Sequence, residues 1–99
     1  MIGDFKYGAA VEAATYRQRL VKRTELEYYA IDTAYTTDCG YETAVAMLGM
    51  FGRGRPWRIV EYYSTREEAA KGHGKWVKFC KTNNPTSVYD VQLQQEVKL

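Results

Sequence analysis

The residues best suited to binding chemistry lie between two strand-like segments, in the stretch Arg-Gly-Arg-Pro-Trp-Arg at positions 53–58. Its functional side chains are Arg53, Arg55, Trp57 and Arg58. Guanidinium groups bind phosphate in a fixed fork geometry, and an indole offers a flat face on which a base can stack. The stretch therefore predicts a binding site for a nucleotide-type ligand. The alternative is a solvated hairpin loop whose arginines maintain solubility while Trp57 begins a strand.

A second basic stretch lies nearer the start of the chain. If residues 15–23 form a strand, Arg17, Arg19 and Arg23 lie on the same side of it, because alternate residues of a strand share a face. Such a row of cations can follow a phosphate backbone, and it can equally form the polar face of a sheet. Nucleic acid is therefore a second candidate partner, although a formal net charge of +2 does not argue for it alone.

The one histidine of the chain, His73, sits between Gly72 and Gly74 in a segment with helical periodicity. A glycine inside a helix costs about 1 kcal/mol relative to alanine, so we expect a structural gain in return. Gly72 falls on the apolar stripe, where a missing side chain lets the helix approach a sheet closely. His73 falls on the same stripe. We interpret it as a buried structural residue that bonds to a strand or loop group.

Catalytic and cofactor motifs do not appear in the sequence. The chain has no second histidine and no cysteine at metal-ligand spacing, and it has no phosphate-binding loop, dinucleotide fingerprint or serine-nucleophile motif. Four carboxylates lie on or beside the expected strands, but no spacing joins them into a site: Asp32, Asp38, Glu42 and Glu61. The sequence predicts a protein that is not an enzyme and has no cofactor or metal.

The elements that must position these residues are strands joined by short turns. Residues 28–37, 41–48 and 57–63 have β-branched and aromatic side chains interleaved with polar ones, and turn residues lie at 38–40. Their connections leave no room for a crossover helix, so antiparallel hairpins are expected. Residues 15–23 form a further expected strand, which can continue through residues 25–29.

A helix is predicted over residues 65–81. Ser64 and Glu67 have the spacing of a capping box at its start. Its apolar stripe, which we expect to pack on the sheet, comprises Ala69, Gly72, His73, Trp76, Val77 and Cys80. Together these patterns predict an α+β fold, an antiparallel sheet of three to five strands with one amphipathic helix on one face.

The chain length and the two terminal segments complete the expected domain organisation. The 99 residues are enough for one domain, spanning residues 1–99, and residues 1–8 are expected to be flexible. In residues 86–99, apolar side chains at even spacing predict an edge strand or assembly tail, through which the protein could form a homo-oligomer. No apolar run is long enough to span a membrane, and acidic residues interrupt any early signal sequence.

The segment from Asp32 to Phe79 resembles a group of small uncharacterised proteins of tailed bacteriophages and prophages. The shared pattern consists of Tyr41-Glu42-Thr43, Tyr62-Tyr63, Glu67-Glu68-Ala69, Gly72-His73 and Trp76-Val77. The resemblance covers about half of the chain. It implies a phage setting and an α+β fold, and it implies no activity.

These observations lead to a functional expectation with two alternatives. We expect a non-enzymatic phage accessory protein in the cytoplasm of an infected bacterial host. It would act by binding a host protein or a nucleotide-type ligand and so interfere with host defence or metabolism. The first alternative is a nucleic-acid-binding module that uses Arg53, Arg55 and Arg58. The second is a virion structural or assembly component that uses the C-terminal segment.

Overall fold

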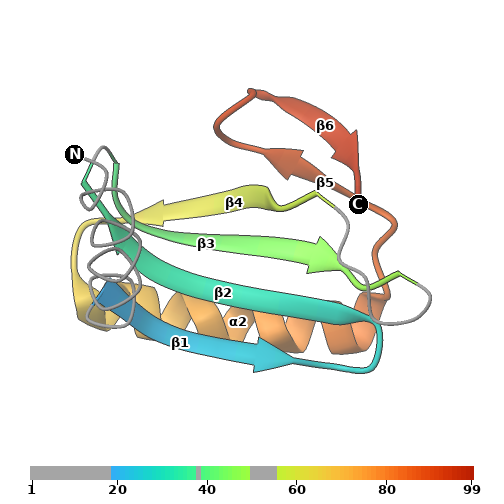
Figure 1. Cartoon of the computed structure of the whole chain (residues 1–99), viewed down its shortest axis with the longest axis horizontal. Coiled ribbons are helices and arrows are strands. Elements are labelled where there is room, and N and C mark those ends of the chain that lie inside the picture. Colours follow the sequence, from blue (N-terminus) through green and yellow to red (C-terminus); the bar gives the residue numbers. More distant parts are fainter. Residues whose placement is uncertain (1–18, 38, 50–55) are drawn as a thin grey trace, which may run out of the picture.

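The computed structural model describes residues 19–37, 39–49 and 56–99. Its fold is the predicted α+β class, a four-stranded antiparallel sheet in the order β1-β2-β3-β4 with one long helix, α2, packed on one face (Figure 1). A separate two-stranded sheet contains β5 and β6. No helix of the described residues has the length and apolar character that crossing a bilayer requires.

The main sheet consists of β1 (Leu20–Glu25), β2 (Tyr29–Thr36), β3 (Gly40–Met47) and β4 (Arg58–Tyr63). Each strand pairs antiparallel with the next in sequence, as the hairpin prediction requires. Gly40 begins β3 with a φ of +78°, a conformation that glycine adopts without steric penalty.

The first strand differs from its prediction at both ends: it begins at Leu20, because the preceding residue Arg19 is helical and not part of the strand. It runs to Glu25, but it does not continue to Tyr29, because residues 26–28 turn the chain into β2. The Leu26 amide donates to the Tyr29 carbonyl oxygen across this turn at 2.7 Å. The expectations for residues 1–8 and for the beginning of the strand at residues 15–18 lie outside the described residues.

The helix α2 (Arg66–Asn83) is the predicted helix, and its cap lies one residue later than expected. Thr65, not Ser64, is the N-cap: its Oγ1 accepts from the Glu68 amide at 3.1 Å, and Glu68 Oε1 accepts from the Ser64 amide at 3.2 Å. Glu67 remains an acidic residue of the first turn without the capping contact. Ser64 with Glu67 and Thr65 with Glu68 both have the capping-box spacing. Which pair forms the cap therefore depends on the residue at which the helix begins after β4.

The prediction of a single strand over residues 86–99 is wrong, because this segment is a hairpin of β5 (Ser87–Asp90) and β6 (Gln95–Lys98). Asp90 makes the turn: its Oδ1 accepts from the amides of Gln92 and Leu93 at 2.8 and 2.9 Å. The turn changes which residues face inward. Of the evenly spaced apolar residues, Leu99 is buried but Tyr89 and Leu93 are exposed, and Val88, which lies outside that set, is buried.

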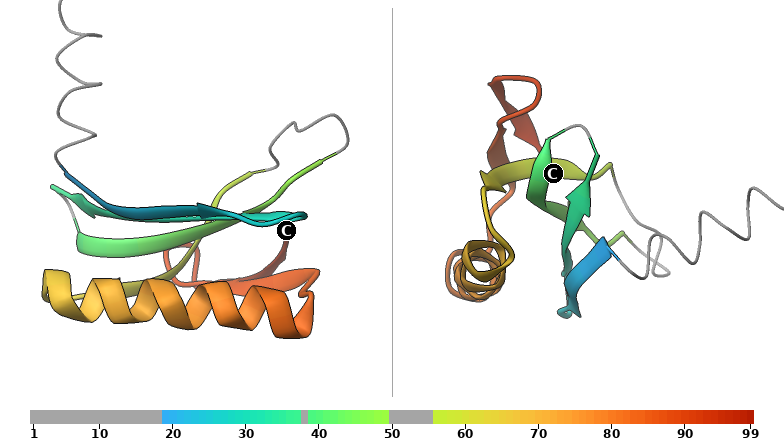
Figure 2. Two further views of the ribbon diagram at one scale, coloured as in Figure 1. Left: turned by 90° about the horizontal axis from the view of Figure 1, so that it is seen from below. Right: turned by 90° about the vertical axis from the view of Figure 1, so that its left-hand side faces the viewer.

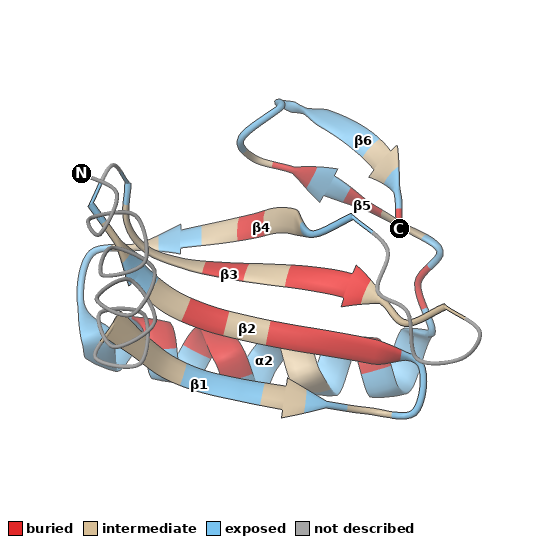
Figure 3. Cartoon of the chain, in the orientation of Figure 1, coloured by how far each residue is buried: buried red, intermediate tan, exposed pale blue. Residues whose placement is uncertain are grey.

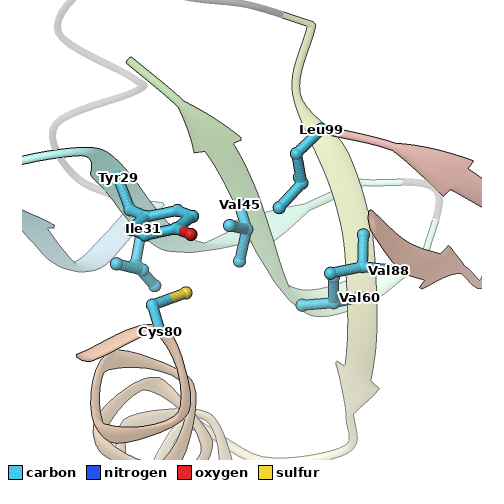
Figure 4. Packing of buried hydrophobic residues seen from close by; sticks show 7 residues of the cluster. All are labelled: Tyr29, Ile31, Val45, Val60, Cys80, Val88 and Leu99. Atoms are coloured by element: carbon cyan, nitrogen blue, oxygen red, sulfur yellow. The ribbon is translucent and has the colours of Figure 1, made fainter. Parts of the chain in front are cut away.

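The core joins the sheet, the helix and the hairpin. Its buried side chains come from β2, β3, β4, α2, β5 and the C-terminus, and Figure 4 shows them converging: Tyr29, Ile31, Val45, Val60, Cys80, Val88 and Leu99. Figure 3 shows that burial is concentrated along β2 and β3, the two central strands. In Figure 2, α2 lies along one face of the sheet only. We call the opposite face the outer face, and no described helix or strand is layered over it.

Candidate functional site

Arg19 and Trp57, which the sequence singled out in separate segments, line the same pocket on the outer face. Arg19 directly precedes β1 and Trp57 directly precedes β4, the two edge strands, so the pocket extends diagonally across the width of the sheet. The pocket has a volume of about 290 Å³ and is also lined by Asp32, Ala34, Glu42, Ala44 and Ile59.

The register of β2 and β3 creates this hollow. Asp32 lies opposite Ala44, and Ala34 lies opposite Glu42. In this block of four residues, the two alanines occupy one diagonal and the two carboxylates occupy the other. Alternate residues of a strand point to opposite faces, and these four therefore share the outer face. Because an alanine leaves most of its position empty, the floor of the pocket is apolar and its polar groups stand at the sides.

Trp57 is held by a cation on its ring. Its residue is 41% exposed, and the Arg23 guanidinium carbon lies 5.4 Å from the ring centroid. Arg23 also forms ion pairs of 3.3 Å with Asp32 and with Glu25. A cation–π contact of this kind contributes about 0.5–1 kcal/mol at an exposed site. Arg23 thus orients the indole and balances the charge of Asp32.

Arg19 and Glu42 each have a polar group that lacks a partner among the described residues. The Nε atom of Arg19 is buried and has no hydrogen-bond partner within the described ranges. Burial raises the pKa of the Glu42 carboxyl, and the Asp90 carboxylate raises it further. The pocket is therefore lined by the Arg19 guanidinium and by one carboxylate that no described cation offsets.

The other predicted binding residues do not join this pocket. Arg58 lies on β4, and its Nε donates to the carbonyl oxygen of Lys98 at 3.2 Å, so it ties β4 to the end of β6. Arg17, Arg53 and Arg55 lie outside the described residues. Asp32 and Glu42 could not be assigned to a site from the sequence, because their relation to Arg19 and Trp57 depends on the strand register.

His73 lies on the opposite side of the sheet, under α2, and only 1% of it is exposed. Its Nε2 is 2.8 Å from Thr24 Oγ1 on β1, and its Nδ1 is 2.7 Å from Thr33 Oγ1 on β2. Burial is the main cause that lowers the pKa of the imidazole, and the Lys22 charge adds to it, whereas Asp32 opposes it. The imidazole is thus enclosed and bonded at both nitrogens.

These bonds continue across the sheet as one chain of hydroxyl groups. Thr33 Oγ1 lies 2.6 Å from Thr43 Oγ1, which lies 3.0 Å from the Tyr63 hydroxyl, and Tyr63 donates to Glu61 Oε1 at 3.0 Å. Glu61 also accepts from the Trp76 indole at 2.9 Å and pairs with the Lys75 ammonium at 2.6 Å. The Lys75 and Trp76 bonds keep the pKa of the Glu61 carboxyl low against the opposing effect of burial, which is the largest single influence.

The charge of Glu61 fixes the direction of every bond in this chain. A hydroxyl has one proton to donate, and that of Tyr63 goes to Glu61, so Tyr63 accepts from Thr43. By the same reasoning Thr43 accepts from Thr33, and Thr33 accepts from Nδ1–H of His73. We therefore assign the neutral imidazole a proton on Nδ1 and an accepting Nε2. This arrangement satisfies the buried polar groups, and it gives His73 a structural role.

The space for this chain is provided by Gly72. A Cβ atom on Gly72 would overlap the hydroxyl and ring carbons of Tyr63, so any larger residue would displace the phenol. Gly74 has open space around it, and no packing contact explains that glycine.

No family model, curated protein or solved structure matches this chain. A function for the outer-face pocket therefore has to follow from its geometry and chemistry.

Proposed function

We propose that this protein is a non-enzymatic binding protein that holds a nucleotide-type ligand in the outer-face pocket, with the base against Trp57. The observation that supports this most is the convergence of Arg19 and Trp57 on one hollow with an apolar floor. Small-molecule sites commonly combine an aromatic wall with a few convergent polar groups. The volume of about 290 Å³ lies just below the usual range for such sites, so it suits the base of a nucleotide and not the whole molecule.

The charges of the pocket favour entry of the base, with the phosphate left in water. Asp32 and Glu42 face the hollow alongside the guanidinium of Arg19, and Arg23 is engaged with Asp32. A phosphate on the alanine floor would therefore meet two carboxylates. A flat base can instead lie on the apolar floor and offer donors and acceptors to the groups at the sides.

Tryptophan fluorescence tests this proposal, because Trp57 and Trp76 are the two tryptophans of the chain. In Trp76→Phe, only Trp57 emits, and saturable quenching by nucleoside monophosphates is expected. In the matched variant Trp57→Phe, the emission of Trp76 on α2 should not respond. Replacing Trp57 or Arg19 by alanine is expected to weaken binding about tenfold or more, measured by calorimetry. A correctly folded Trp76→Phe protein that responds to no nucleotide would overturn the proposal.

The wider setting that we propose is the cytoplasm of a bacterium infected by a phage. There the protein would interfere with host defence or metabolism by withholding or sensing a nucleotide. The resemblance of residues 32–79 to small phage proteins motivates this part. Native mass spectrometry of protein recovered from expressing bacteria should show a bound nucleotide, and the Trp57→Ala protein should lack it. Recovery of a stoichiometric host protein, with an empty pocket, would contradict it.

A nucleic-acid partner is less well supported by the described surface. Arg19 and Arg23 are interleaved with Asp32, Glu42 and Glu25, so this face carries mixed charge rather than a basic stripe. Binding of one nucleotide should depend weakly on salt, whereas oligonucleotide binding should fall steeply as salt increases. A steep salt response to oligonucleotides, together with no response to mononucleotides, would favour nucleic acid instead.

Self-association through the C-terminal segment remains a proposal, and it would now use the edge of the β5–β6 hairpin. Within the described chain, β6 pairs with β5 on one side only, so its other edge could pair with a second copy. Light scattering over a range of protein concentrations should then show a dimer. A constant monomer mass at all concentrations would exclude it.

A further inference from the structure

Two groups at the sides of the outer-face pocket determine what kind of base it accepts. Arg19 lines the pocket with its guanidinium group, whose Nε is shielded from solvent, and Glu42 is a half-buried acceptor without a compensating cation among the described residues. Burying such groups without partners is unfavourable, and a ligand that supplies both partners recovers that loss. The ligand must therefore carry an acceptor for a guanidinium and donors for a carboxylate on one flat ring system.

We propose that the base bound in this pocket is guanine, with Glu42 accepting from N1–H and the 2-amino group, and with Arg19 donating to a ring acceptor. This inference rests on the proposed function. Guanine carries two adjacent donors that the two oxygens of one carboxylate can accept together, and its O6 and N7 suit a guanidinium.

The other bases match Glu42 less well. Adenine offers its 6-amino group beside the lone pair of N1, and cytosine offers its 4-amino group beside the lone pair of N3. In both cases one carboxylate oxygen would face a lone pair instead of a donor. Uracil has a single ring donor between two carbonyl groups, which repel a carboxylate. Only guanine gives both oxygens of the carboxylate a proton.

Glu42, not Asp32, is the residue that distinguishes the bases. Asp32 is already paired with Arg23 at 3.3 Å, so its charge is balanced before any ligand arrives. Glu42 has no ion pair with a described residue, and it lies directly opposite Ala34 in the β2–β3 register. A base on the alanine floor therefore has its edge within reach of this carboxylate.

The experiment titrates the full-length Trp76→Phe protein with GMP, IMP, AMP and CMP, following Trp57 emission. GMP is expected to bind most tightly. IMP keeps N1–H and lacks the 2-amino group, so it should bind about tenfold more weakly. AMP and CMP should be weaker still. Equal affinity for GMP and AMP would overturn the guanine assignment and leave the proposed nucleotide site intact, whereas no binding of any nucleotide would overturn both.

A substitution at Glu42 gives a second, independent test. The amide of Glu42→Gln can pair with the amino group and N1 of adenine, so the preference for GMP over AMP should disappear or reverse. Glu67→Gln is the matched control, because Glu67 is exposed on the first turn of α2 and does not line the pocket. An unchanged GMP-to-AMP ratio in a folded Glu42→Gln protein would overturn the role of Glu42.

Discussion

The phenol of Tyr63 occupies the space that Gly72 leaves on the buried face of α2. This relationship explains why a glycine is placed at the centre of a helix, where it lowers helix stability. Tyr63 joins the hydroxyl chain of Thr33 and Thr43 to Glu61, and that chain ends on His73. Gly72 thus allows the buried polar network under the helix to form.

Gly72→Ala is expected to destabilise the protein by about 1–3 kcal/mol, because the new methyl group forces Tyr63 to move. Gly74→Ala is the matched control, since a Cβ there meets nothing within 4 Å. It should stabilise the protein by about 0.5–1 kcal/mol through helix propensity alone. Urea unfolding measures both changes. A Gly72→Ala protein as stable as the wild type would show that Tyr63 does not need this space.

Thr43→Val is expected to move the proton of the imidazole from Nδ1 to Nε2. Without the Thr43 hydroxyl, Thr33 loses its acceptor and can donate to Nδ1 instead, so His73 must donate from Nε2 to Thr24. Nitrogen-15 NMR reports the tautomer without ambiguity, because the chain has one histidine. Thr24→Val is the control and should leave the proton on Nδ1. The same tautomer in wild type and Thr43→Val would contradict the assigned bond directions.

His73 is expected to reduce stability as the pH falls below about 6.5, its ordinary pKa. Burial lowers the pKa of the folded imidazole, so the unfolded chain binds a proton over a range in which the folded chain does not. The contribution of His73 is therefore fully present above this range and is lost as the pH falls through it. An NMR titration of the folded protein should give a His73 midpoint below 6.5.

The matching stability measurement compares the wild type with His73→Gln by urea unfolding between neutral and mildly acidic pH. Glu42 acts in the opposite direction, because its raised pKa stabilises the fold at low pH, and this effect is present in both proteins. The difference between the two curves isolates the imidazole. A His73 midpoint at or above 6.5 would show that the ring is not excluded from water as described.

Cys39 and Cys80 are expected to differ sharply in their reactivity. Cys39 is exposed, whereas Cys80 is 1% exposed and burial raises its pKa to about 11. Because the thiolate is the reactive form, iodoacetamide should alkylate Cys39 in the native protein and leave Cys80 unmodified. Peptide mass spectrometry locates the label, and both cysteines should react in urea. Native labelling of Cys80 would mean that the core near α2 opens readily.

Local periodicity was enough to predict several features of this fold. Alternating side chains specified the strands that became β2, β3 and β4, and a 3.6-residue period specified α2 and placed Gly72 and His73 on its buried face. These features follow from residues a few positions apart. For that reason the fold class and the hairpin order could be predicted from the chain alone.

Contacts between residues far apart in the chain could not be predicted and are known from the folded protein. The fold placed Thr65 at the helix cap, turned residues 86–99 into a hairpin, and gave His73 its threonine partners on β1 and β2. It also brought Arg19 and Trp57 to one pocket with Glu42. Strand register sets these relationships, because a shift of one residue moves a side chain to the other face of the sheet. The register depends on packing across the whole sheet, which no local pattern contains.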